Sequence, residues 1–219
     1  MLTQSLLLAS GGMDSTVLAF WLLSKKLDVR PLFIDYGQHC SETELSTLRR
    51  VLPDGLSSNI EVINVSDIYR FCDSRLIVEP NLWEERVTAD DLYIPYRNLL
   101  LLSIGAAVAQ ARGIPYECAA FINSNHAKEI DCSHQFFSML TDLLAEFGRV
   151  EVRMPFRYMS KTDVAQLGVE VGAPIAETFS CQANSEVHCG VCPNCVDRIT
   201  ALSQVRTLQN ENRITPEEM

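Results

Sequence analysis

The sequence predicts an α/β protein, with a doubly wound parallel sheet covered by helices on both faces and a small metal-binding segment near the carboxyl terminus. Three observations support this prediction. Apolar runs of strand length alternate with runs of helix length, two adjacent glycines stand between the first strand and the first helix, and four cysteines lie within residues 181–195. Alternation of this kind is typical of a parallel sheet, because helices connect its strands.

The first half of the chain supplies three of the predicted strands. They occupy residues 5–9, 29–34 and 59–65. The apolar run 17–23 indicates a buried helix after the first strand, and a capping box from Ser41 to Glu44 predicts a helix after the second. In parallel sheets, ligands bind beyond the carboxyl ends of the strands, so the turns that follow the first two strands are candidate ligand sites.

The second half continues the alternation. The mixed segment 66–92 predicts a short helix and a mobile loop. Further helices are predicted at 99–112, at 132–147 and from Ser160 until Gly172, and further strands at 116–121 and 150–154. The helix at 99–112 is apolar around its circumference, so we expect it to be buried between layers and to end at Gly113.

Length and composition predict one main domain. A chain of 219 residues with 47% apolar and 21% charged residues is ordinary for a globular protein with one sizeable core. We assign residues 1–175 to the α/β domain, residues 176–205 to a four-cysteine segment packed on it, and residues 206–219 to a polar tail.

Charge and hydropathy narrow the choice of partners. The formal net charge of -10 and the sequence pI near 4.8 argue against a broad contact with nucleic acid, which needs clustered lysines and arginines. The first residues carry no basic leader, and the longest uncharged apolar stretch, 99–109, is far shorter than the roughly 20 residues that span a bilayer. We therefore expect a cytoplasmic protein that binds neither nucleic acid nor a membrane.

The segment Ser10-Gly11-Gly12-Met13-Asp14-Ser15-Thr16 lies where the first strand turns into the first helix. Glycines let backbone N–H groups approach a ligand with no Cβ in the way, and the helix behind them offers unpaired N–H groups and a positive dipole end. This combination predicts an anion cradle, most naturally for phosphate. The alternative is a tight turn in which Asp14 or Ser15 only caps the helix.

The same segment resembles the S-G-G-x-D-S signature of the PP-loop ATP pyrophosphatases, and all fixed positions match. It lacks the lysine of the common P-loop and the spacing of the dinucleotide-binding motif. The resemblance implies a Rossmann-like fold of the adenine nucleotide alpha hydrolase type. It also implies that ATP is consumed, with AMP attached to a carboxylate, amide or carbonyl oxygen and pyrophosphate released.

The predicted ATP ligands comprise this loop and the end of the second strand: Ser10, Gly11, Gly12, Asp14, Ser15, Thr16, Asp35 and Tyr36. The glycines are expected to use backbone N–H groups, and Ser15 and Thr16 their hydroxyls. Asp14 is expected to organise the loop and Mg²⁺, because two anions repel unless a cation intervenes. Arg97 and Lys161 are catalytic candidates that neutralise developing negative charge, and the alternative for each is an exposed surface charge.

A second motif, C-x7-C-x2-C-x2-C, comprises Cys181, Cys189, Cys192 and Cys195. Four thiolates at this spacing predict a closed, tetrahedral structural zinc site with one ion per chain. An iron–sulfur cluster is the competitor, since C-x2-C-x2-C also occurs in ferredoxin-type ligation, although here the fourth cysteine lies upstream. Four unrelated buried cysteines are the remaining alternative. His188 is expected to be a polar loop residue rather than a ligand.

Taken together, the motifs resemble the 7-cyano-7-deazaguanine synthase (QueC) family over nearly the whole chain. The resemblance uses the PP-loop, Asp35-Tyr36-Gly37-Gln38, Pro95-x-Arg97-Asn98, Asp131-Cys132, Lys161 and the four cysteines. It implies an ATP-dependent carbon–nitrogen ligase with a structural zinc, which converts 7-carboxy-7-deazaguanine and ammonia into the nitrile preQ0, an intermediate of queuosine and other deazaguanines. We assign recognition of the purine-like base to Asp131, and the alternative is that Asp131 caps the helix after it.

The chain departs from the family pattern at two places. Tyr96 stands where the family usually has glycine, and residues 123–133 lack the family's usual run in the expected substrate region. A related ligase, which adenylates another deazaguanine and forms an amide or a conjugate, is therefore the first alternative. A PP-loop tRNA sulfur transferase is the second, and a non-enzymatic nucleotide-binding or zinc-stabilised module is the third. We also consider a homodimer.

Overall fold

The computed structural model describes residues 3–122 and 132–211. Within them, parallel strands form one five-stranded sheet in the order β3-β2-β1-β4-β5. The strands are β1 (Gln4–Leu8), β2 (Asp28–Asp35), β3 (Glu61–Asn64), β4 (Tyr116–Cys118) and β5 (Glu151–Arg153). The chain moves outward from β1 to β3 and then returns to the other side of β1, which is the order of a doubly wound sheet. The predicted fold class is confirmed.

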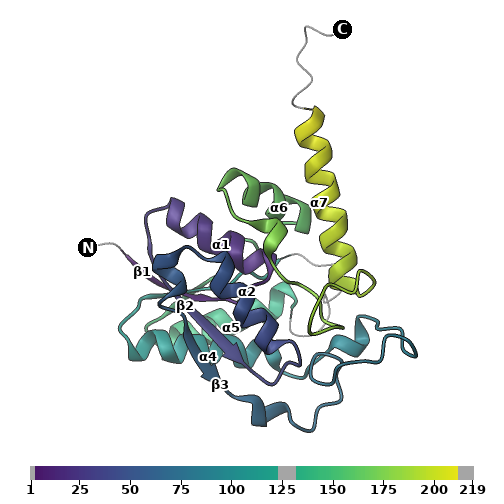
Figure 1. The fold of residues 1–219 in the computed structure, drawn as a ribbon. Helices are drawn as coiled ribbons and strands as arrows, with labels where there is room; N and C mark the ends of the chain where they lie inside the picture. Colours follow the sequence, from purple (N-terminus) through teal and green to yellow (C-terminus); the bar gives the residue numbers. More distant parts are fainter. Residues whose placement is uncertain (1–2, 123–131, 212–219) are drawn as a thin grey trace, which may run out of the picture.

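Helices cover both faces of the sheet (Figure 1). They are α1 (Met13–Ser24), α2 (Ser41–Val51), α3 (Asp54–Ser57), α4 (Arg97–Ala111), α5 (His134–Phe147), α6 (Lys161–Glu170) and α7 (Pro193–Glu211). Leu7 and Phe33 share a buried cluster with α1, α2 and α6, whereas Leu6 and Leu32 pack against α4 on the opposite face. This alternation follows from the pleat of a strand, which points successive side chains to opposite faces.

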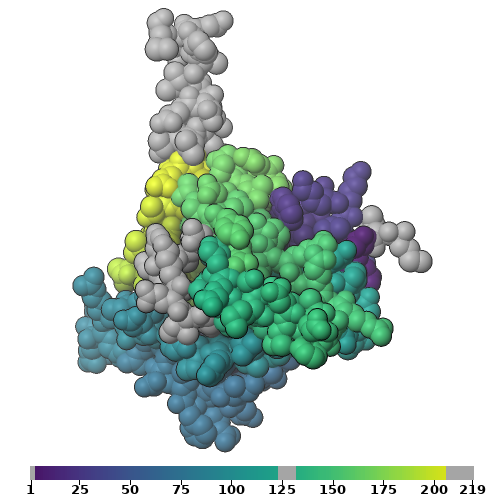
Figure 2. Space-filling view, turned by 180° about the vertical axis from the view of Figure 1, so that it is seen from behind, coloured from purple at the N-terminus to yellow at the C-terminus, as the bar shows by residue number. Residues whose placement is uncertain are grey.

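Residues 66–96 connect the edge strand β3 to α4. They contain the 3-10 turns η1 (Ser66–Tyr69) and η2 (Asp90–Leu92), which is less regular structure than the short helix that the sequence predicts. The space-filling view from behind shows this part of the chain, in blue, along the lower side of the molecule, with the green and yellow of α6 and α7 above it (Figure 2).

Several predicted elements differ in their bounds. β4 and β5 are each shorter than predicted, and the short helix α3 was missed. The capping box predicted from Ser41 to Glu44 is wrong, because Cys40 is the N-cap residue of α2 and no side chain caps the helix. Ser41 is already helical, and Glu44 lies on the buried face of α2 together with Leu48. A residue four positions before a buried leucine shares its helix face, which explains the inward position of Glu44.

α4 is buried on one side only, so the prediction that it lies between two layers is wrong. Leu102 and Ala109 are fully buried and α4 packs on β1 and β4, while Ala107 and Gln110 are exposed. The segment 90–111 has the length and apolar composition of a membrane span, a test that core helices also pass. The helix α4 itself ends at Ala111 with Arg112 as its C-cap, and the predicted stop, Gly113, follows with a φ of +69°.

The carboxyl-terminal segment ends in the long helix α7, which packs along α6 and extends away from the sheet in Figure 1. Residue 206, where the sequence analysis places the start of the polar tail, lies within this helix. Buried side chains of α7 recur at helical spacing, at Cys195, Arg198, Ala201 and Val205. Arg198 donates hydrogen bonds to the carbonyls of Ile175 and Ala176. These contacts join the four-cysteine segment to the α/β domain.

Candidate active site and metal centre

The glycine-rich loop between β1 and α1 lies at the switch point of the sheet, where the strand order reverses. Gly11 has a φ of +73°, and a Cβ placed on it would lie 2.5 Å from the carbonyl oxygen of Glu44 and 2.9 Å from the amide nitrogen of Leu48. Only glycine fits both the left-handed backbone and the close approach of α2. Gly12 is the N-cap of α1, and no side chain caps that helix. The alternative that Asp14 or Ser15 serves only as a cap is therefore wrong.

Hydroxyl groups inside the loop hold it in shape. The Ser15 hydroxyl donates to the carbonyl of Gly12 (3.2 Å) and accepts from the amide of Ser10 (3.2 Å), and the Ser10 hydroxyl accepts from the amide of Gly12 (3.3 Å). Thr16 is fully buried. The Ser15 hydroxyl thus bonds within the loop, while Oγ1 of Thr16 is buried and has no hydrogen-bond partner among the described residues, so the role of both hydroxyls as phosphate ligands stays a prediction. The first N–H groups of α1 remain the natural anion donors.

Lys161 joins the loop from the other end of the chain. Its ammonium group lies 2.7 Å from Oδ2 of Asp14, and the two side chains are only 20% and 23% exposed. The alternative of an exposed surface charge is therefore wrong for Lys161. The second carboxylate oxygen of Asp14, Oδ1, is buried and has no hydrogen-bond partner among the described residues. A buried, unpaired carboxylate oxygen beside an anion cradle fits the expected Mg²⁺, a cation that prefers oxygen ligands.

The carboxyl end of β2 lies beside the glycine-rich loop and forms the next part of the candidate site. The carboxylate of Asp35 accepts from the amide of Gly37 (3.0 Å) and from Nδ2 of Asn64 (2.8 Å), so it fixes the turn after the strand. Tyr36 is buried, and burial raises the pKa of its hydroxyl while the nearby Arg97 opposes that rise. The structure thus places Arg97, the first residue of α4, beside Tyr36.

Glu44 is a buried acid that the sequence analysis missed. Its carboxylate accepts from Nε2 of Gln38 (3.0 Å) and from the thiol of Cys40 (3.6 Å). Burial raises the pKa of Glu44 to about 7, while the hydrogen bonds from Gln38, Cys40 and Gln182 and the charge of Arg97 oppose the rise. Its position on the buried face of α2 was a signal in the sequence, but the capping-box interpretation assigned the same residue to a helix end.

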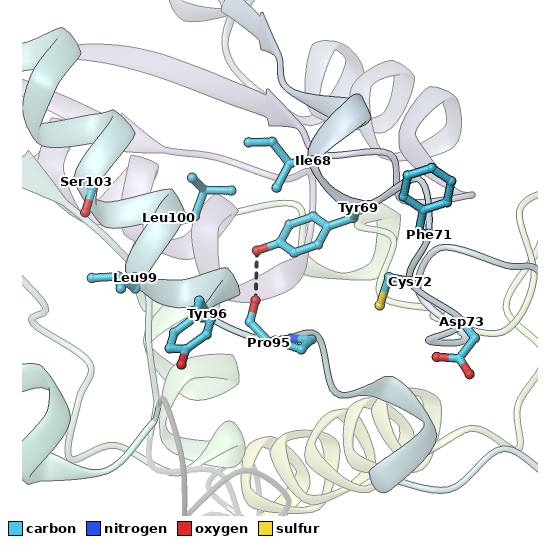
Figure 3. A pocket seen from close by; sticks show the side chains of 10 residues that line it. All are labelled: Ile68, Tyr69, Phe71, Cys72, Asp73, Pro95, Tyr96, Leu99, Leu100 and Ser103. Carbon is cyan, nitrogen blue, oxygen red and sulfur yellow. Dashed lines mark hydrogen bonds between the residues drawn. The ribbon is translucent and has the colours of Figure 1, made fainter.

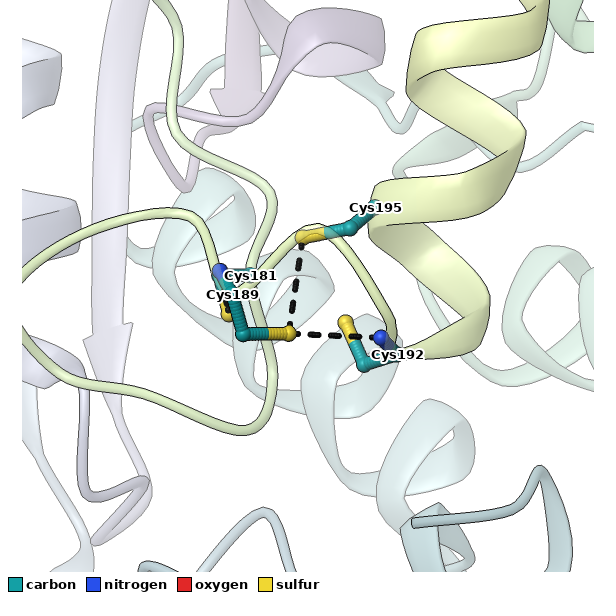
Figure 4. A group of neighbouring side chains, drawn as sticks. All are labelled: Cys181, Cys189, Cys192 and Cys195. Atoms are coloured by element: carbon teal, nitrogen blue, oxygen red, sulfur yellow. Dashed lines mark hydrogen bonds between the residues drawn. The ribbon is translucent and has the colours of Figure 1, made fainter. Parts of the chain in front are cut away.

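The four cysteines converge on one point (Figure 4). Their sulfur atoms all lie within 4.8 Å of one another, and Sγ of Cys189 is 3.9 Å from Sγ of Cys195. Hydrogen bonds from Cys181 and Cys195 lower the pKa of Cys192, which favours a thiolate there. His188 points elsewhere, accepting from the amide of Ser180 (3.2 Å), as expected for a residue that is not a ligand. The cysteines therefore form a candidate metal site.

The segment that contains the cysteines touches the glycine-rich loop directly. The amide of Phe179 donates to the carbonyl of Gly11 (3.0 Å). The thiol of Cys40 lies 3.8 Å from the carbonyl of Cys181, and His39 bonds the hydroxyl of Ser185 (2.8 Å). A metal held by the cysteines would therefore stabilise the backbone that supports the loop.

Comparison with known proteins gives the family. The model of the family "Queuosine biosynthesis protein QueC" matches residues 4–206. The chain belongs to the QueC family. The QueC relatives include 7-cyano-7-deazaguanine synthase 1 of Desulfitobacterium hafniense, 31% identical over 90% of this chain and 90% of the relative. The 7-cyano-7-deazaguanine synthase of Porphyromonas gingivalis is 31% identical over 91% of this chain and 92% of the relative.

Solved structures similar to this QueC chain support its fold. A 4-thiouridine synthetase in complex with RNA and ATP matches with a TM-score of 0.52 and 16% identity, covering 95% of this chain and 53% of the other. The U34-tRNA thiolase NcsA from Methanococcus maripaludis, which holds a [4Fe-4S] cluster, matches with a TM-score of 0.52 and 13% identity, covering 96% and 68%. At such low identity these structures show the shared fold alone.

Tyr96, where the resemblance to the family implies a glycine, has a left-handed backbone. Its φ is +58°, in the left-handed region, and it is the N-cap of α4. Glycine adopts this conformation without strain, whereas a tyrosine pays on the order of 1–3 kcal/mol. Tyr96 is 72% exposed and lines a cavity of about 620 Å³, where the Tyr69 hydroxyl donates to the carbonyl of Pro95 (3.0 Å; Figure 3). This QueC chain thus presents an aromatic side chain directly before Arg97.

Asp131, the residue predicted to recognise the base, lies outside the described residues. The alternative that it caps α5 is wrong, because Ser133 is the N-cap residue and its hydroxyl accepts from the amide of Phe136 (3.0 Å). The roles of the remaining predicted site residues stay predictions, with the glycine-rich loop, Lys161 and Arg97 arranged around the carboxyl ends of β1 and β2.

Proposed function

We propose that this chain is a 7-cyano-7-deazaguanine synthase, an AMP-forming carbon–nitrogen ligase that converts 7-carboxy-7-deazaguanine and ammonia into preQ0. The observation that supports it most strongly is a phosphate-type cradle in a QueC-family chain, with Lys161 held 2.7 Å from Asp14 at its mouth. The curated relatives of similar length bear the name of this activity. The cytoplasm is the proposed location.

The proposed reaction expels each substrate oxygen as part of AMP. A carboxylate oxygen attacks the α-phosphorus of ATP, pyrophosphate leaves, and ammonia then displaces AMP to give the amide. The amide oxygen attacks a second ATP, and loss of AMP and the remaining N–H protons gives the nitrile. The amides at the start of α1 would hold the pyrophosphate, and Lys161 and Arg97 would neutralise charge that develops in the transition states.

The cofactors of the proposed enzyme follow from the donor atoms present. Mg²⁺ would supply charge neutralisation between Asp14 and the phosphates. Zinc fits the four cysteines: Zn–S bonds of about 2.3 Å in a tetrahedron require sulfur atoms about 3.8 Å apart, close to the observed 3.9 Å between Cys189 and Cys195. An iron–sulfur cube between the thiolates would hold them further apart than one ion does. With four protein ligands, the zinc would be structural, one ion per chain.

Partners of the proposed enzyme are a small deazaguanine acid and ammonia, without direct contact to nucleic acid or membrane. The net charge of -10 supports the absence of contact with nucleic acid, because a phosphate backbone repels an acidic surface. We keep a homodimer as the proposed assembly. Asp131 remains the proposed contact to the base, and Asp35 and Tyr36 the proposed contacts to ATP.

A second candidate function is favoured by Tyr96. A bulky side chain in place of glycine, beside Arg97 and a cavity of about 620 Å³, changes the shape of the region next to the proposed substrate site. A QueC-like ligase that adenylates a related deazaguanine and forms an amide or a conjugate with another acceptor would fit this change. A tRNA sulfur transferase is the third candidate, and bound iron would favour it over the others.

The test is incubation of the protein with ATP, magnesium, ammonium and 7-carboxy-7-deazaguanine, read by mass spectrometry. The proposal predicts the nitrile, two AMP per nitrile, and the amide as an intermediate. Accumulation of the amide as the end product would favour the second candidate. No reaction of this acid would refute the first candidate, and turnover without any ATP consumption would refute both.

A further inference from the structure

A group of three side chains outside the glycine-rich loop lies at the same edge of the sheet. His134 is the first residue of α5, and Arg157 and Tyr158 lie in the turn between β5 and α6. This turn follows the carboxyl end of β5 and directly precedes Lys161, the residue that pairs with Asp14. Since the carboxyl ends of parallel strands meet at one edge, the group stands beside the proposed ATP site, on its β4–β5 side.

The group holds the guanidinium of Arg157 in one orientation. Nε of Arg157 donates to Nδ1 of His134 (3.0 Å), and Nη2 donates to the His134 carbonyl. The guanidinium carbon lies 5.6 Å from the ring centre of Tyr158 and 5.7 Å from that of Phe137. The ring centres of His134 and Tyr158 lie 4.8 Å apart, with the two rings tilted by 30° to each other. We call His134, Arg157 and Tyr158 the arginine–aromatic cluster.

One end of this guanidinium is open to a ligand. Nη1 of Arg157 has no hydrogen-bond partner among the described residues, and no acidic side chain pairs with Arg157 there, whereas Lys161 is already held by Asp14. An arginine whose Nε and Nη2 are bonded keeps further N–H donors in the same plane. Within the part of the chain that the structure describes, the guanidinium therefore retains donors and a charge without an acidic partner, in a chain of net charge -10.

Core packing and backbone hydrogen bonds hold the turn that presents the cluster. Phe156 is 1% exposed and packs edge-on against Trp21, with ring centres 6.2 Å apart. Backbone hydrogen bonds close the turn, from Arg157 to Met154 (3.2 Å) and from Met159 to Phe156 (2.8 Å). Tyr158 is nevertheless 73% exposed. A large ring that contacts His134 and Arg157 and is left open to solvent is suited to stack on a planar ligand.

We propose that the arginine–aromatic cluster is the subsite for a planar heteroaromatic carboxylate, with Arg157 bonding the carboxylate and Tyr158 stacking on the ring. The proposal rests on the proposed function, for which it names residues that recognise the acid before adenylation. Pairing with arginine holds a carboxylate in a fixed plane, because the guanidinium donors match its two oxygens. One oxygen can then be directed toward ATP at the neighbouring loop.

The test compares Arg157→Gln and Arg157→Lys with Arg149→Gln. Arg149 is an exposed arginine two residues before β5, near the amino-terminal end of that strand, and serves as the matched control. Dissociation constants for 7-carboxy-7-deazaguanine and for its carboxamide are measured by calorimetry, together with the KM of the acid and of ATP. Thermal melting confirms that each variant is folded.

The proposal predicts that Arg157→Gln weakens binding of the acid about 10- to 100-fold, the effect of losing a hydrogen bond to a charged group, and leaves ATP and the carboxamide nearly unchanged. Arg157→Lys should recover part of the loss, since it keeps the charge without the planar fork. Tyr158→Ala should weaken acid and carboxamide alike, whereas Tyr158→Phe should weaken neither. Arg149→Gln should match the unmodified chain.

Two results would overturn the proposal. A raised KM for ATP with unchanged acid binding would make Arg157 a phosphate ligand, and unchanged binding of both ligands would remove the cluster from the site. In either case an unmodified chain that binds the acid leaves the proposed function intact. An unmodified chain that does not bind the acid would refute the proposed function as well.

Discussion

Substitution of Gly11 by alanine tests whether α2 supports the glycine-rich loop by direct backbone contact. A left-handed backbone costs an alanine about 1–2 kcal/mol relative to glycine, of which about 0.4–1 kcal/mol is returned because alanine restricts the unfolded chain. At Gly11 the new Cβ would also lie 2.5 Å from the Glu44 carbonyl and 2.9 Å from the Leu48 amide. Both are backbone atoms, so either the loop or the whole helix must shift, which adds about 1–3 kcal/mol.

Gly172 provides the matched control. Its φ is +72°, nearly that of Gly11, and a Cβ placed on it would meet no atom within 4 Å. Gly172→Ala should therefore lose about 1 kcal/mol of unfolding free energy and keep its affinity for ATP, whereas Gly11→Ala should lose about 2–4 kcal/mol and bind ATP at least about tenfold more weakly. Urea unfolding and calorimetric titration with ATP measure both quantities. Equal losses of unfolding free energy in the two variants would refute the contact between α2 and Gly11. Unchanged ATP affinity in Gly11→Ala would refute the role of the glycine-rich loop in binding the phosphates of ATP.

Three further predictions concern Lys161, Glu44 and the cysteines. Lys161→Ala should lower kcat/KM about 100-fold with a stability loss of about 1 kcal/mol, and normal turnover would remove Lys161 from the site. The pKa of Glu44 is about 7 in the folded chain, above the usual 4.5, so its protonated form stabilises the fold at low pH and that stability is lost as pH rises from about 4.5 to 7. The loss of unfolding free energy should total about 3 kcal/mol and be absent in Glu44→Gln. If the unfolding free energies of the two chains depend on pH in the same way, burial does not raise the pKa of Glu44. Removal of the metal with a chelator should lower Tm by about 10 °C and weaken ATP binding, because Phe179 joins the cysteine segment to Gly11; unchanged ATP affinity in the metal-free chain would separate the two sites.

Local sequence signals were sufficient to predict the glycine-rich loop, the neighbouring strand end and the four-cysteine cluster. Gly11 and Gly12 lie between an apolar strand and an apolar helix, and Asp35 ends the next strand, so the rule that ligands bind at the carboxyl ends of parallel strands placed them together. The four cysteines were found by their spacing alone, and the structure brings their sulfur atoms within 4.8 Å. In each case the evidence lies within a few residues of sequence.

The missed features depend on contacts between distant parts of the chain. The pair of Lys161 with Asp14 joins residues 147 positions apart, and nothing in either neighbourhood indicates the partner. The contact of His134 with Arg157 depends likewise on how α5 packs beside β5. Glu44 was misassigned because a capping box and a buried helix face compete for the same position. Helix α7 was missed because Arg198 interrupts its apolar stripe, although Arg198 is 5% exposed and satisfied by carbonyl groups.

The central claim is that both carboxylate oxygens of the substrate leave as parts of AMP. It is tested by incubating the protein with ATP, ammonium and 7-carboxy-7-deazaguanine labelled with ¹⁸O in both carboxylate positions, and by measuring the isotope content of AMP and pyrophosphate by mass spectrometry. The account predicts two AMP per nitrile, each with one ¹⁸O atom, and unlabelled pyrophosphate. Unlabelled AMP, or ¹⁸O recovered only in water or in phosphate, would contradict it.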